Sequence, residues 1–148
     1  GDEFVEGGLV PKDDEEIVPL FEAAGMELLS VSAGVYESME RIVPPKKHGV
    51  SPHLEITREI KKYTRVPICT VGSIISRGLE IAEDILSKER AAICALGRAQ
   101  MADPRLVKKS YEGKEEEINE CIHCNSCTFW TTGDPEVYCA VNPDYKKP

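Results

Sequence analysis

Three short apolar segments, each followed by an amphipathic helical pattern, constrain the fold of this chain most strongly. The expected strands cover residues 26–32, 66–71 and 91–96, and a glycine follows each of them closely. Strands that are apolar on both faces are typical of parallel sheets covered by helices. The alternation therefore predicts an α/β fold built from consecutive βα units.

Helix signals fill the intervals between these strands. Capping residues and prolines at helix starts predict four helices, which run from Asp13 or Asp14 to Ala24, from Ser51–Pro52 to Tyr63, from Ser76 past Leu86, and from Asp103–Pro104 to Tyr111. Pro19 lies inside the first of these patterns, so that helix is expected to start late or to bend. From about residue 115 the periodicity fades, which predicts a βα part over residues 1–114 and a loop-rich segment over residues 115–148.

The composition excludes several classes of protein. The 148 residues include 26 acidic and 18 basic side chains, and the net charge of -8 repels the phosphates of nucleic acids. No apolar stretch approaches the roughly 20 residues that span a bilayer. The sequence starts with neither the basic region nor the apolar run of a signal peptide. We therefore expect a cytoplasmic protein without nucleic-acid or membrane partners.

Four of the six cysteines fall between residues 121 and 139. In a protein without export such a group is more typical of metal binding than of disulfides. Cysteines separated by two residues in one loop, completed by a more distant thiolate, suit a [4Fe–4S] cluster, whereas zinc sites usually offer two separated pairs. The favoured interpretation is a cluster, with zinc and disulfides left open, held by Cys121, Cys124, Cys127 and Cys139. His123 stands between two of these cysteines and is expected to point away from the metal.

Glycines and polar residues follow two of the expected strands. Gly72–Ser73 and Gly97–Arg98 stand where the carboxyl ends of parallel strands form the active site of a (β/α)8 barrel. Glycine lets backbone N–H groups approach an anion, and arginine offers two parallel hydrogen bonds to a phosphate. A phosphate site and a pair of ordinary turns are both consistent with this pattern. Tyr36 follows the first strand and would face the same mouth, although a loop tyrosine is more often a packing residue.

The remaining histidines and cysteines carry no site signal of their own. His48 and His53 lie in a polar connection and at a helix start, so both are expected to be solvated. Cys69 and Cys94 lie inside apolar strands and are interpreted as small core residues.

Several stretches together resemble one family. They are Glu6-Gly7-Gly8, residues 25–32, residues 66–74, Leu96-Gly97-Arg98, Ala102-Asp103-Pro104, and the cysteine run that ends in Cys139-Ala140-Val141-Asn142-Pro143. In this order they are similar to the C-terminal half of the FMN barrel in NADH:flavin oxidoreductases of the old yellow enzyme family. The similarity is greatest to the iron–sulfur branch, which includes 2,4-dienoyl-CoA reductase, 2-enoate reductase and trimethylamine dehydrogenase.

The resemblance implies a role for each group of candidate residues. The FMN phosphate would be held at the two strand ends, by Gly72, Ser73, Gly97 and Arg98, and the four clustered cysteines would carry a [4Fe–4S] cluster near the flavin. The enzyme would use NAD(P)H to reduce an activated C=C bond in a small enoate or enoyl-CoA substrate. Tyr36 falls where the reductase branch has a histidine that helps to protonate or orient the substrate, and this departure leaves the substrate open. The alternative is a non-enzymatic zinc- or cluster-binding module whose βα part is a scaffold.

The length of the chain is short for a complete barrel. A (β/α)8 barrel needs about 250 residues, and this chain has 148. We therefore expect the C-terminal βα units of a TIM (β/α)8 barrel, a partial barrel with the loop-rich cluster segment attached. Its open strand edges would need the missing N-terminal half-barrel or self-association, and alone it is expected to be inactive.

Overall fold

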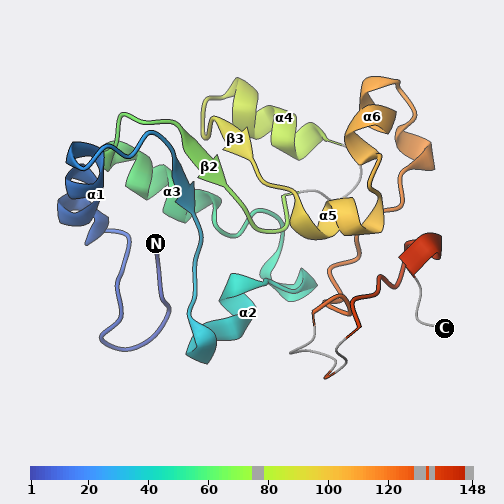
Figure 1. The fold of residues 1–148 in the computed structure, drawn as a ribbon, viewed down its shortest axis with the longest axis horizontal. Helices are drawn as coiled ribbons and strands as arrows, with labels where there is room; N and C mark the ends of the chain where they lie inside the picture. The colour runs from blue at the N-terminus through green and yellow to red at the C-terminus, as the bar shows by residue number, and fades with distance from the viewer. Residues whose placement is uncertain (75–78, 129–132, 134–135, 146–148) are drawn as a thin grey trace.

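A small parallel sheet lies at the centre of the structure. The computed structural model describes residues 1–74, 79–128, 133 and 136–145. Within these residues one sheet has the order β1-β2-β3, with β1 at Leu29–Val31, β2 at Ile68–Thr70 and β3 at Ile93–Cys94 (Figure 1). Consecutive βα units place their strands side by side, parallel and in sequence order. The α/β prediction is confirmed, although each strand is shorter than the apolar segment that predicted it.

Helices follow each strand. The α-helices of the described residues are α1 (Asp14–Ala23), α2 (Met39–Ile42), α3 (Leu54–Ile60), α4 (Glu80–Ser87), α5 (Gly97–Ala102) and α6 (Leu106–Tyr111). Short 3-10 helices are η1 (Tyr36–Ser38), η2 (Lys46–His48), η3 (Lys61–Tyr63), η4 (Glu115–Glu117) and η5 (Pro143–Tyr145). Helix α1 starts at Asp14 with three acidic residues in its first turn, which suits the positive end of a helix. Of the two alternatives that Pro19 raised, the late start is therefore wrong, and the bend stays a prediction. Ser76, the predicted cap of α4, lies outside the described residues.

Residues 97–113 differ from the predicted turn and single helix. Gly97 begins α5, so Gly97 and Arg98 form the first turn of a helix rather than a loop. Asp103 then interrupts the helix in an extended conformation, and α6 starts only at Leu106. Asp103 is 2% exposed, and its side chain accepts hydrogen bonds from the backbone N–H of Arg105 and of Asn119, both at 3.0 Å. This carboxylate therefore separates the two helices and ties the start of the cysteine segment to them.

Two apolar clusters pack the helices against the sheet. The first joins α1, β1, α3 and β2, and its buried members are Val18, Val31, Ala33, Ile56, Ile60 and Ile68. The second lies around α4 and α6, and its buried members are Ile74, Ala82, Ile85, Ala91 and Leu106. Figure 1 shows α1 and α3 on one side of the strands and α4 and α6 on the other, with the cysteine segment beside α5. None of the helices in the described part of the chain is both long and apolar enough to cross a membrane.

The predicted core cysteines lie in or beside these clusters. Cys69 is 8% exposed on the central strand, as predicted. Cys94 is half-buried and packs against the second cluster. Next to Cys69, the hydroxyl groups of Thr57 and Thr70 form a buried hydrogen bond of 2.9 Å that joins α3 to β2. Buried hydroxyl groups that bond each other avoid the cost of unpaired polar atoms.

Candidate cofactor sites at the strand ends

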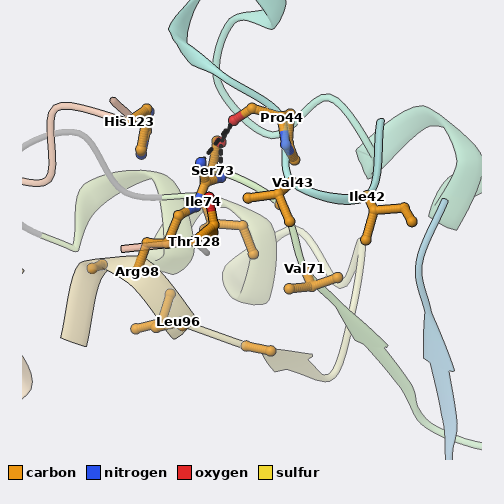
Figure 2. A pocket seen from close by; sticks show the side chains of 14 residues that line it. Ile42, Val43, Pro44, Val71, Ser73, Ile74, Leu96, Arg98, His123 and Thr128 are labelled. Carbon is orange, nitrogen blue, oxygen red and sulfur yellow. Dashed lines mark hydrogen bonds between the residues drawn. The ribbon is translucent and has the colours of Figure 1, made fainter. Parts of the chain in front are cut away.

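The predicted phosphate residues meet at one cavity. Parallel strands β2 and β3 end at the same edge of the sheet, and the cavity there has a volume of about 240 Å³. Gly72, Ser73, Gly97 and Arg98 all line it (Figure 2). The facing wall is formed by residues 42–44, which we call the strap. Sequence reasoning missed the strap, because it has no glycine and no charged side chain that would mark a site.

Gly72 occupies a position that only glycine fits. Its φ of +105° and that of +49° at Ser73 turn the chain sharply after β2. A Cβ atom on residue 72 would lie 2.7 Å from Nδ1 of His53, well inside contact distance. At Gly97, by contrast, such a Cβ would meet no described atom within 4 Å apart from its chain neighbours and the backbone of its own helix. The two glycines were predicted as equivalents, and the structure shows that they differ.

His53 and His48 are not solvated, which corrects the sequence prediction. The His53 ring is 2% exposed and donates a hydrogen bond from Nε2 to the carbonyl oxygen of Arg41 at 2.7 Å. Burial lowers the pKa of His53. His48 has a side chain 13% exposed, and its Nδ1 lies 3.3 Å from the Arg41 guanidinium. The Gly72 turn, distant in sequence, lies against the His53 ring, whereas His48 is held by Arg41 and Glu40 of the preceding segment.

Arg98 connects three segments of the chain. Its Nη1 donates to the carbonyl oxygen of Pro44 at 2.9 Å and to Oδ1 of Asn125, while Nη2 donates to Oγ of Ser73 at 2.8 Å (Figure 2 shows the first and the last). Burial lowers the pKa of the guanidinium, and the neighbouring cysteines oppose this by favouring its charge. The positive charge therefore lies between the strand-end cavity and the cysteine segment.

The four clustered cysteines surround a second, smaller cavity. Cys121, Cys124, Cys127 and Cys139 line it together with Arg98. Burial raises the pKa of Cys121 and Cys127, and Arg98 works against this shift in both. Among the described residues, no three His, Cys, Asp or Glu side chains are close enough to hold a single metal ion. A cube binds each thiolate at a different iron, so its ligands lie farther apart than those of one tetrahedral ion.

Two asparagines attach the cysteine segment to the rest of the fold. Nδ2 of Asn125 donates to the carbonyl oxygen of Val43 at 3.0 Å, and Nδ2 of Asn142 donates to that of Met101 at 2.8 Å. Asn142 is 2% exposed. Sequence reasoning missed both contacts. For Asn125, the available signal was an asparagine between two ligand-type cysteines.

The predicted catalytic tyrosine lies away from both cavities. Tyr36 begins η1 after β1, and 85% of it is exposed. Tyr36 does not line the strand-end cavity. His123, which the sequence predicts to point away from the metal, does line this cavity. The catalytic role of Tyr36 stays a prediction.

Comparisons with known sequences identify the class of protein. No family model matches the chain. The chain is 43% identical over 124 residues to NADH oxidase of Thermoanaerobacter brockii, a match that covers 84% of this chain and 19% of the relative. It is 29% identical over 143 residues to cinnamate reductase of Clostridium sporogenes, covering 96% of this chain and 21% of that protein. These relatives are oxidoreductases by name, and the chain spans about a fifth of their length.

Solved structures agree with this class. A complex of 2-naphthoyl-CoA reductase with 2-naphthoyl-CoA superposes with a TM-score of 0.85 at 29% identity, over 97% of this chain and 22% of the other. Histamine dehydrogenase of Rhizobium sp. 4-9 shares the fold, with a TM-score of 0.81 at 23% identity, over 97% of this chain and 20% of the other. These relatives and neighbours support the NADH:flavin oxidoreductase, or old yellow enzyme, family.

Proposed function

We propose that this chain is part of an FMN- and [4Fe–4S]-dependent oxidoreductase that uses NAD(P)H to reduce an activated C=C bond. One observation carries the proposal: Arg98 lines both the strand-end cavity and the cavity of the four cysteines. A cation at this place can serve a phosphate on one side and a negatively charged cluster on the other. The names of the relatives, a cinnamate reductase and a naphthoyl-CoA reductase among them, support an unsaturated small molecule as substrate.

The residues at the strand ends fit the phosphate of FMN. The Arg98 guanidinium has five N–H groups, and three donate to the described acceptors Pro44, Ser73 and Asn125. The other two can bind phosphate oxygens. The Gly72–Ser73 turn adds backbone that can approach an anion closely, because residue 72 has no side chain. The chain would therefore hold the phosphate with Arg98, Ser73 and the backbone of residues 72–73 and 97.

The cysteine segment fits an iron–sulfur cluster by its donor set. Cys121, Cys124, Cys127 and Cys139 are four thiols around one cavity, which is the ligand number of a [4Fe–4S] cluster. Metal binding deprotonates such thiols, so the raised pKa of Cys121 is compatible with a loaded site. Once bound, the flavin supplies hydride chemistry and the cluster supplies single electrons, while the protein orients both groups.

We further propose that a complete barrel requires residues beyond this chain. Both outer edges of the described sheet, at β1 and β3, lack a neighbouring strand. Large apolar side chains are exposed on β3 and on the elements near β1, with Leu20 70%, Phe21 54%, Leu28 47% and Ile93 44% exposed. An N-terminal half-barrel, or a second copy of the chain, would cover such edges. The boundary between a barrel part and a cluster segment near residue 114 belongs to the same proposal.

Anaerobic reconstitution with iron and sulfide tests the cluster directly. We expect about four irons and four sulfides per chain, with broad absorption near 400 nm. Cys124→Ser should remove the colour, and Cys69→Ser, a change in the core, should retain it. A colourless protein that takes up one zinc ion per chain would instead identify a zinc module.

A further inference from the structure

Asn125 uses both ends of its side-chain amide. It lies between Cys124 and Cys127 with a φ of +60°, a left-handed conformation that asparagine tolerates better than most residues. Its Oδ1 accepts a hydrogen bond from Nη1 of Arg98, and its Nδ2 donates one of 3.0 Å to the carbonyl oxygen of Val43. One side chain of the cysteine loop thus contacts a wall of the strand-end cavity and the cation beside it.

The backbone of Asn125 is also held. Its carbonyl oxygen accepts a hydrogen bond of 3.0 Å from the Thr128 backbone N–H and one of 2.6 Å from the Thr128 hydroxyl. These bonds close the loop that contains Cys127. The side chain of Asn125 therefore projects from a fixed turn, and its two contacts position the whole loop rather than one free side chain.

Arg98 depends on Asn125 for its placement towards the thiols. Two of its described acceptors, Pro44 and Ser73, belong to the strand-end cavity, and only Asn125 belongs to the cysteine loop. Without the Asn125 amide, the guanidinium would keep its two contacts at the first cavity. Among the described residues, no other contact would then fix the distance between the guanidinium and the cysteines of the second cavity.

We propose that Asn125 is the positioning residue that holds the Arg98 charge at the four-thiol site and joins the cysteine loop to the strap. This inference rests on the proposed function in so far as the thiols carry a cluster. The reduction potential of an iron–sulfur cluster depends on net charge and hydrogen bonds around it. Because the energy of two charges depends on their separation, an Arg98 held beside the thiols raises the potential more than one that is free to move away.

The metal-free chain tests the positioning without any cluster. Iodoacetamide alkylation of the 148-residue chain, mapped by mass spectrometry, reports how often each thiol becomes accessible. At a pH high enough to ionise the thiols in both proteins, we expect Cys121 and Cys127 to react about tenfold faster in Asn125→Ala, since the loop loses two hydrogen bonds that oppose local opening. The matched control is Asn142→Ala, which removes the other amide contact, to Met101, and leaves Arg98 untouched. Unchanged rates in Asn125→Ala, or the same acceleration in both variants, would overturn the proposal.

The loaded chain tests the electrostatic part. After reconstitution, Arg98→Gln should lower the cluster's reduction potential in the wild-type background. In the Asn125→Ala background the same substitution should have a markedly smaller effect, and equal shifts in both backgrounds would overturn the inference. If no variant takes up iron while the alkylation rates change as expected, the proposed cluster is wrong and the positioning role stands. If Asn125→Ala is unfolded by circular dichroism, Asn125→Gly, which removes both amide contacts and suits the φ of +60°, replaces it in both experiments.

Discussion

Gly72→Ala should destabilise the fold strongly, because it combines backbone strain with a steric clash. At a φ of +105° a residue with a Cβ is strained by about 1–3 kcal/mol. The new methyl group would also lie 2.7 Å from Nδ1 of His53, which is 2% exposed and bonded to Arg41. Overpacking of this kind costs about 1–3 kcal/mol. The sum, about 2–6 kcal/mol, is a large part of the 5–15 kcal/mol of a typical domain.

Urea denaturation followed by circular dichroism would measure this change. The matched control is Gly97→Ala, which meets open space at the start of α5 and should change stability by less than about 1 kcal/mol in either direction. Combining Gly72→Ala with His53→Ala should recover about 1 kcal/mol or more relative to the sum of the single changes, because the double variant removes the clash. A cost below about 1 kcal/mol for Gly72→Ala, or strict additivity, would refute the reasoning.

Three further predictions concern ligand binding and pH. In the complete enzyme, Arg98→Ala should weaken FMN binding by about 2–3 kcal/mol, the scale of a hydrogen bond to a charged group. The control Arg58→Ala, on α3 with a side chain 74% exposed, should leave FMN binding unchanged. If both variants retain flavin equally through gel filtration, the phosphate site lies elsewhere. The isolated chain should bind FMN no more tightly than roughly millimolar, about 4 kcal/mol, so a micromolar constant by calorimetry would contradict the partial-barrel proposal. His53 has a pKa lowered from 6.5 by burial, so the unfolded chain gains its proton first and stability should fall as pH decreases below 6.5. His53→Gln should flatten this slope between pH 6.5 and 5 in urea titrations, and an unchanged slope would mean that His53 is not its source.

Local sequence patterns predicted the sheet well. The segments that contain Ile68 and Ile93 are apolar on both faces, and they became neighbouring parallel strands. The same patterns placed Ser73 and Arg98 just after strand ends, and the structure joins these two by a hydrogen bond of 2.8 Å. Strand ends converge whenever parallel strands are neighbours, so this part of the site follows from secondary structure alone.

The remaining features depend on contacts between distant residues. In the sequence His53 looks like a solvated residue at a helix start. It is buried by the turn at Gly72, and nothing in the sequence around Gly72 predicts a contact with His53. The strap belongs to the site because Arg98 reaches the carbonyl oxygen of Pro44, and a backbone acceptor has no sequence signature. Asn125 was overlooked for a similar reason, since one of its two partners is the backbone of Val43.

The contacts of the cysteine segment also suggest an order of events during synthesis. Its described partners in the βα part, which include Val43, Arg98 and Met101, all precede Cys121 in the chain. At about 5–20 residues per second, the ribosome would complete this surface seconds before it completes the thiols. The docking surface can therefore be in place when Cys121 emerges, and the fourth thiol, Cys139, comes last. In the proposed enzyme, cluster insertion would then be a late step of maturation, acting on a scaffold that no longer needs to fold around it.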